Sequence, residues 1–71
     1  MIILTQDGNA VYDTEKFAGI YTQDCSIYMI AYTGEVAYPL GTYDSEDKCK
    51  EIIHDIFALE GCQGKYDMPV M

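Results

Sequence analysis

The stretch L-G-T-Y-D-S-E-D-K-C-K-E-I-I-H-D-I-F, residues 40–57, decides the fold because a strand ends and the longest predicted helix begins inside it. Asp44 or Ser45 suits the N-cap position, where a side-chain oxygen accepts a hydrogen bond from a backbone N–H of the first turn. Glu46 and Asp47 follow, and their negative charge is stabilised at the positive end of the helix dipole. The sequence therefore predicts that a helix begins near residue 45.

Apolar residues recur at helical spacing after this start. They are Cys49, Ile52, Ile53, Ile56 and Phe57. Together they form one apolar stripe on a helix of residues about 45–60, and such a stripe is typical of a helix that covers a sheet. His54 lies off the stripe and is predicted to face solvent, and Gly61 suits the C′ position after the helix.

The residues before the helix alternate between short apolar segments and turn signals. The predicted strands are residues 2–5, 10–12, 17–23, 26–33 and 36–42. Turn signals at this spacing are typical of an antiparallel meander. Pro39 has no N–H to donate, so the last strand is predicted to be an edge strand or to be bulged there. The predicted fold is α+β, a twisted antiparallel sheet of four or five strands with one C-terminal helix packed across it.

The chain is predicted to form a single domain, 1–71, with strands over about 2–42 and an extended tail over 62–71. The tail carries apolar residues that we expect to pack on this domain or on a second subunit. Seventy-one residues bury only a small core. The three cysteines are an odd number without a C-x-x-C pair, so they are predicted to be reduced thiols rather than disulfides. A homo-oligomer, most simply a homodimer, is the remaining way to bury more apolar surface.

The composition is strongly acidic. Twelve acidic residues face four lysines and no arginine, which gives a net charge of −8. A duplex-binding surface carries clustered lysine and arginine, and none is visible in this sequence. Two interpretations stay open: the charge keeps the protein soluble, or it faces a basic partner as a nucleic-acid mimic would. No apolar run is long enough for a membrane span and no basic signal region opens the chain, so we expect a cytoplasmic protein without a membrane partner.

Tyrosine is the enriched aromatic residue, with seven copies. Tyr28 and Tyr32 share one face of the predicted strand 26–33, and Tyr21 and Tyr38 are expected to join them across the ladder. Aromatic rings on an open sheet stack single-stranded bases in several folds, so Tyr28 and Tyr32 are the predicted binding surface. Two alternatives stay open, namely a dimer interface and the ordinary preference of tyrosine for half-buried strand positions.

Three aspartates fall in predicted turns between strands. Asp7, Asp13 and Asp24 would come together if their turns lay at one end of the meander. Clustered carboxylates hold Mg²⁺, which polarises a phosphate and activates water for phosphodiester cleavage. We therefore predict Asp13 and Asp7 as catalytic residues and all three aspartates as ligands of a divalent cation. The alternative is that each aspartate only bonds the backbone of its own turn.

Most of residues 1–60 resemble small proteins of anaerobic gut bacteria and their prophages. The opening I-I-L-T-Q-D and the step L-G-T-Y-D-S-E-D-K-C-K-E-I-I carry this resemblance. The corresponding positions are Gln6, Asp7, Leu40, Gly41, Tyr43, Ser45 and Glu46. In size and element order the chain is also similar to a family of Cas9 anti-CRISPR proteins that nick supercoiled DNA. The fold of that family is like that of a single-strand-binding transcriptional coactivator.

This resemblance implies a phage-derived anti-defence protein that protects DNA from Cas9 by nicking or relaxing supercoiled DNA. It makes a metal-dependent DNA nickase the expected activity, with Asp13 and Asp7 as the residues to test. Two alternatives stay open. One is a non-catalytic acidic protein that occupies a basic nucleic-acid channel of a partner such as Cas9, and the other is a housekeeping dimeric adaptor.

Overall fold

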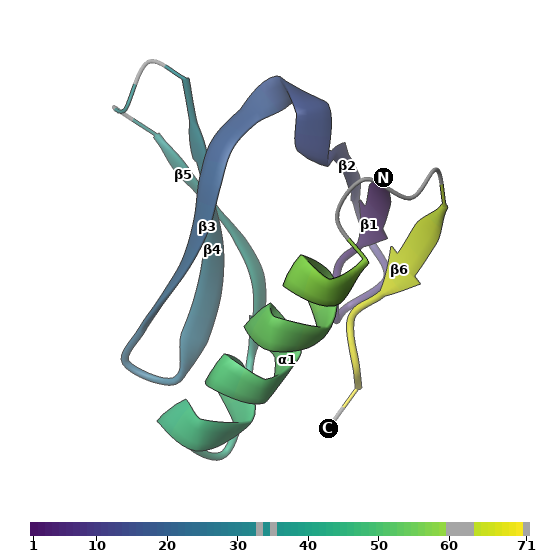
Figure 1. Ribbon diagram of the computed structural model, residues 1–71. Coiled ribbons are helices and arrows are strands. Elements are labelled where there is room, and N and C mark those ends of the chain that lie inside the picture. Colours follow the sequence, from purple (N-terminus) through teal and green to yellow (C-terminus); the bar gives the residue numbers. More distant parts are fainter. Residues whose placement is uncertain (33, 35, 60–63, 71) are drawn as a thin grey trace.

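The computed structural model describes residues 1–32, 34, 36–59 and 64–70, and within them it is an α+β arrangement of two small sheets and one α-helix (Figure 1). One sheet has the strand order β2-β1-β6, from β1 (Ile2–Leu4), β2 (Val11–Asp13) and β6 (Lys65–Asp67). The other has the order β3-β4-β5, from β3 (Phe17–Gln23), β4 (Ser26–Ala31) and β5 (Ala37–Thr42). The helix α1 spans Glu46–Ala58. The predicted α+β class is confirmed.

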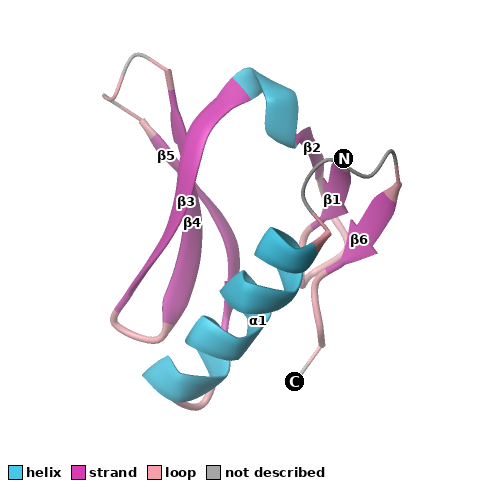
Figure 2. Ribbon diagram, in the orientation of Figure 1, coloured by secondary structure: helices cyan, strands magenta, loops and turns pink. Residues whose placement is uncertain are grey.

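The prediction of one continuous meander was wrong, because the strands divide into two sheets of three. A 3-10 turn, η1 (Thr14–Lys16), separates β2 from β3 and redirects the chain between the sheets (Figure 2). The Asp13 side chain caps this turn. The third strand of the first sheet comes from the tail, since β6 pairs with β1 in parallel. A parallel pair needs a crossover connection, and α1 lies within that connection.

The β3-β4-β5 sheet is antiparallel throughout. A two-residue turn joins β3 to β4, and both of its residues have positive φ, 52° at Asp24 and 64° at Cys25. Two consecutive positive φ values define the type I′ turn that matches the twist of a hairpin. Strand β5 is an edge strand with a register shift opposite Ile27 and Tyr28, next to Pro39. The expectation from Pro39 is therefore confirmed.

Helix α1 begins as the sequence predicts. Ser45 is the N-cap, and its Oγ accepts the Lys48 backbone N–H at 3.1 Å. His54 is exposed, as expected. Phe57 is 75% exposed, so the prediction that it belongs to the buried stripe was wrong. The expected C′ residue Gly61 lies outside the described residues.

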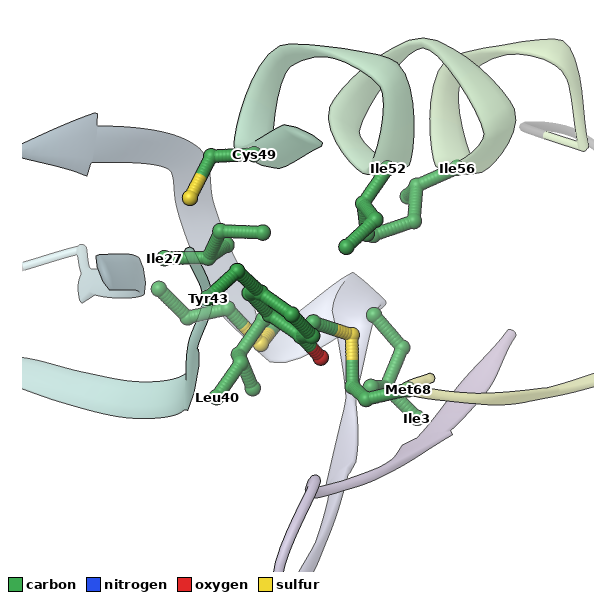
Figure 3. Packing of buried hydrophobic residues seen from close by; sticks show 9 residues of the cluster. Ile3, Ile27, Leu40, Tyr43, Cys49, Ile52, Ile56 and Met68 are labelled. Carbon is green, nitrogen blue, oxygen red and sulfur yellow. The ribbon is translucent and has the colours of Figure 1, made fainter. Parts of the chain in front are cut away.

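The helix covers both sheets, and one core lies between the three layers. Cys49, Ile52 and Ile56 point from α1 toward side chains of both sheets (Figure 3). The buried hydrophobic residues are Ile3, Ile27, Met29, Leu40, Tyr43, Cys49, Ile52, Ile56 and Met68. The core therefore holds the two sheets in a fixed arrangement around the helix.

The C-terminal segment packs on its own domain, which was one of the two expected outcomes. The Met68 backbone N–H donates to the Leu4 carbonyl oxygen at 3.0 Å, and the Met68 side chain is 3% exposed. The Tyr43 hydroxyl donates to the Pro69 carbonyl oxygen at 2.7 Å. Across the described part of the chain, no helix is long and apolar enough to cross a membrane.

Candidate functional site

Asp7 organises the turn between β1 and β2. Its Oδ1 accepts the Thr5 hydroxyl at 2.7 Å and the Asn9 backbone N–H at 2.9 Å. These hydrogen bonds, the one from Thr5 first, lower the pKa of Asp7 below its ordinary value. Gly8, between Asp7 and Asn9, has a φ of 73°. The D-G-N sequence thus contained the signal of a local turn as well as that of a candidate ligand.

Asp13 lies at the other end of the same hairpin. It pairs with Ile2, whereas the turn with Asp7 begins beyond Thr5, three residues or roughly 10 Å further along β1. The Asp13 Oδ1 accepts the Glu15 backbone N–H at 3.0 Å. Asp24 lies in the β3–β4 turn of the other sheet. The structure therefore does not bring Asp7 and Asp13 together, and the residues it describes include no group of three His, Cys, Asp or Glu side chains placed to hold a metal ion.

The predicted tyrosine surface is rearranged. Tyr28 pairs across the ladder with Tyr21, and the two rings stack with centroids 5.4 Å apart and planes at 25°. Tyr32 follows the end of β4, is 71% exposed, and donates to the Glu15 carbonyl oxygen at 3.4 Å. Tyr38 packs between the sheets against Tyr12 and Phe17, at centroid distances of 5.6 and 5.5 Å. Tyr21 therefore joins Tyr28 as expected, whereas Tyr38 does not.

The three strands of the sheet that carries this tyrosine pair contain no charged residue. Their sequences are F-A-G-I-Y-T-Q, S-I-Y-M-I-A and A-Y-P-L-G-T. In a chain with a net charge of −8 this is a marked separation of charge from apolar surface. Among the described residues, the charged ones lie on the helix, in the turns and on the short strands of the other sheet.

Gln6 connects the end of β1 to β5 and to the C-terminal segment. The Gln6 backbone N–H donates to the Leu40 carbonyl oxygen at 2.8 Å. The Gln6 amide accepts the Thr42 N–H at 2.8 Å and donates to the Thr42 carbonyl oxygen at 2.9 Å. It also donates to the Val70 carbonyl oxygen at 3.1 Å. Gln6 therefore joins β1, β5 and the tail, a contact that the sequence spacing did not reveal.

Glu46 supports the β3–β4 turn from the first turn of α1. Its carboxylate accepts the Cys25 backbone N–H and lies 3.3 Å from the Thr22 hydroxyl oxygen. Burial first, and then the negative charge of Glu46, raise the pKa of the Cys25 thiol. Cys25 and the buried Cys49 are free thiols, whereas Cys62 lies outside the described residues. Glu46 thus fixes the β3–β4 hairpin to the first turn of α1.

Tyr43 should titrate late, because burial raises its pKa to about 12. An acid whose pKa is raised by folding leaves stability unchanged below the unfolded value of about 10 and lowers it as pH rises toward 12. The alkaline ultraviolet titration of the seven tyrosines should therefore contain a late component that Tyr43→Phe removes. A titration of unchanged shape in Tyr43→Phe would contradict this assignment.

An acidic stripe runs along α1. We use this name for Asp47, Glu51 and Asp55, which are all exposed and spaced four residues apart. Neighbours at this spacing lie on one helix face, about 6 Å apart along the axis. Like charges at this spacing destabilise a helix by a few tenths of a kcal/mol per pair. The three charges of the stripe therefore repel one another, and only Asp47, in the first turn, gains from the helix dipole.

An open groove lies between β3 and α1. It has a volume of about 290 Å³, and we call it the β3–α1 groove. Ala18, Gly19 and Ile20 line it from β3, and Ile53, Ile56 and Phe57 line it from α1. A second hollow of about 300 Å³ lies between the β1–β2 turn and β5 and includes Asp7 in its lining. The first is mainly apolar in its lining residues and the second is more polar.

Comparison with known proteins places the chain in no established group. No protein-family model, no curated protein and no solved structure matches it.

Proposed function

We propose that this protein is a non-catalytic acidic binding protein that occupies a basic nucleic-acid-binding channel of a partner protein. The observation that carries the proposal is the acidic stripe of Asp47, Glu51 and Asp55 on the solvent side of α1. These three charges repel one another on the isolated protein. Lysine and arginine side chains of a partner would remove that repulsion.

The overall charge supports the same proposal. A net charge of −8 on 71 residues attracts a basic surface over long range and speeds its encounter. It opposes direct binding to the phosphates of DNA. The resemblance to anti-CRISPR proteins suggests Cas9 as the partner, because the channel that holds its guide–target heteroduplex is positively charged.

The test is competition between this protein and target DNA for a Cas9–guide complex. We expect the protein to block DNA binding, and we expect rising salt to weaken the block because salt screens exposed charges. The variant Asp47→Asn, Glu51→Gln, Asp55→Asn should weaken the block by about tenfold or more, the effect of losing roughly 1.4 kcal/mol of binding free energy.

A matched control separates the stripe from net charge. Glu15, Asp24 and Asp67 are also exposed, so Glu15→Gln, Asp24→Asn, Asp67→Asn removes the same three negative charges. Both variants carry −5, that is −8 plus 3. Equal losses in the two variants would show that net charge alone acts, and no block by the wild-type protein would refute Cas9 as the partner.

The nickase alternative rests on the resemblance, since Asp7 and Asp13 lie at opposite ends of a hairpin. A supercoiled plasmid incubated with the protein, with and without Mg²⁺, tests it. The decisive variant is Asp13→Asn, which keeps a capping oxygen for η1 but removes the charge that would hold a cation. Mg²⁺-dependent nicking by the wild-type protein that Asp13→Asn abolishes would establish the enzyme and overturn the binding proposal.

A further inference from the structure

Strand β3 has an open edge. With seven residues it is the longest strand among the described residues. In the β3-β4-β5 sheet it pairs with β4 alone. Gln23 and Ser26 flank the two-residue turn, so this pair exchanges both backbone hydrogen bonds. By alternation, the backbone N–H and C=O groups of Ile20 and Thr22 point away from β4.

This edge lacks the features that keep edge strands from pairing. Between Phe17 and Gln23 there is no charged residue and no proline. A register shift at Ala18 is the one irregularity, and it leaves the edge regular from Gly19 onward. An added strand could therefore form backbone hydrogen bonds along Ile20 and Thr22.

The β3–α1 groove lies beside this edge. Residues directly opposite each other in an antiparallel pair share one face of the sheet. The residue that paired with Ile20 would therefore lie on the helix side, next to Ile20 itself, Ile53 and Phe57, which line the groove. Phe57 is 75% exposed at this place, although it is a large apolar side chain. The groove and the edge together fit an extended, uncharged strand with an aliphatic side chain at its centre.

We propose that this strand is β3 of a second copy of the chain, paired antiparallel about a twofold axis at Ile20. Strand β3 offers the required chemistry, because it is uncharged and carries Ile20 at its centre. In this register each Ile20 fills the groove of the other copy, and each Tyr21 lies opposite Gly19, where no side chain obstructs its ring. The β3-β4-β5 sheets of the two copies then form one sheet of six strands, and the tyrosine pairs lie on one continuous face of it.

The charge distribution allows a second copy to pair at this edge rather than elsewhere. Each copy carries −8, so most pairs of surfaces would repel. Pairing through β3 places no like charges directly opposite each other, because the strand has none. A strongly basic partner, by contrast, would gain no charge contact along this edge. The proposal is independent of the Cas9 proposal, since it involves neither the acidic stripe nor a nucleic-acid channel.

Sedimentation equilibrium over a concentration series tests the proposal. We expect the mass to rise from the 8.0 kDa of one chain to twice that value. Phe57→Ser should weaken dimerisation by about tenfold or more, as expected for an aromatic residue at the centre of an interface. The matched control is Val70→Ser, which removes a 77% exposed apolar side chain from the C-terminal segment and should leave dimerisation unchanged. A single-chain mass at every concentration, or equal effects of the two variants, would overturn the proposal.

Disulfide trapping tests the register in a protein with Cys25→Ser and Cys62→Ser. Ile20→Cys should cross-link readily, since the Cα atoms of a hydrogen-bonded pair lie about 5.5 Å apart, within the range of a disulfide. Ala18→Cys is the control, because two copies of residue 18 would lie four residues or about 13 Å apart along the strands. Equal cross-linking at the two positions would overturn the twofold axis at Ile20.

Discussion

Replacing Ile56 by alanine should lower the free energy of unfolding by about 2–5 kcal/mol, the usual cost of truncating a large buried aliphatic side chain. Ile56 is 3% exposed and contacts the core from α1, so its loss removes apolar contacts and leaves a cavity. Chemical denaturation followed by circular dichroism measures the change. This is one of the two largest effects that we expect from a single substitution.

His54→Ala is the matched control on the same helix. His54 lies two residues earlier and is exposed, so its replacement should change the free energy of unfolding by less than about 0.5 kcal/mol. If His54→Ala were the more destabilising of the two, the helix would present a different face to the sheets than the one described.

Gly41→Ala should also destabilise strongly, by about 1–3 kcal/mol, the cost of forcing an extra methyl group into a packed site. A Cβ at position 41 would lie 2.9 Å from the Gln6 Cβ and 2.9 Å from the Tyr43 hydroxyl oxygen. Both neighbours are held by hydrogen bonds, Gln6 to Thr42 and Tyr43 to Pro69. The substitution should therefore separate β5 from the other sheet, which thermal or chemical denaturation would detect.

Gly64→Ala provides the comparison for Gly41→Ala. No atom lies within 4 Å of a Cβ built at Gly64. The same chemical change should therefore be neutral or slightly stabilising there, because alanine restricts the unfolded chain. Equal losses at the two positions would show that the close approach of Gly41 to Gln6 and Tyr43 does not limit stability.

The local features of the fold were predictable from the sequence. The N-cap at Ser45 and the burial of Cys49, Ile52 and Ile56 follow from capping chemistry and helical spacing, which depend on near neighbours. Phe57 was misplaced because it lies at the margin of the apolar stripe. The stripe's position in the sequence does not show how far the sheets extend beneath the helix.

The division into two sheets was not predictable in the same way. The pairing of β1 with β6 joins residues more than sixty positions apart, and the short polar sequence K-Y-D of β6 has no strong strand signal. The aspartate hypothesis failed to place Asp7 and Asp13 together for a geometric reason. In a meander, each turn lies at the opposite end of the sheet from the turn before it. Strand β2 separates the turn with Asp7 from Asp13, so the two aspartates lie at opposite ends.

The contacts of Gln6 give two of the resemblance positions a structural role. The Gln6 backbone and side chain bond Leu40 and Thr42 and so hold the end of β1 against β5. The acidic stripe could have been read from the sequence, because its three residues lie four apart on the face opposite the predicted apolar stripe.

The parallel pairing of β1 with β6 has a consequence for how a ribosome delivers this protein. Strand β1 is the central strand of its sheet, yet one of its two partners is synthesised about sixty residues later. Ile3 stays without the cover of Met68 until Met68 itself has left the exit tunnel. Folding during synthesis can therefore complete the β3–β4 hairpin early, whereas closure of the core waits until β6 and Met68 have emerged.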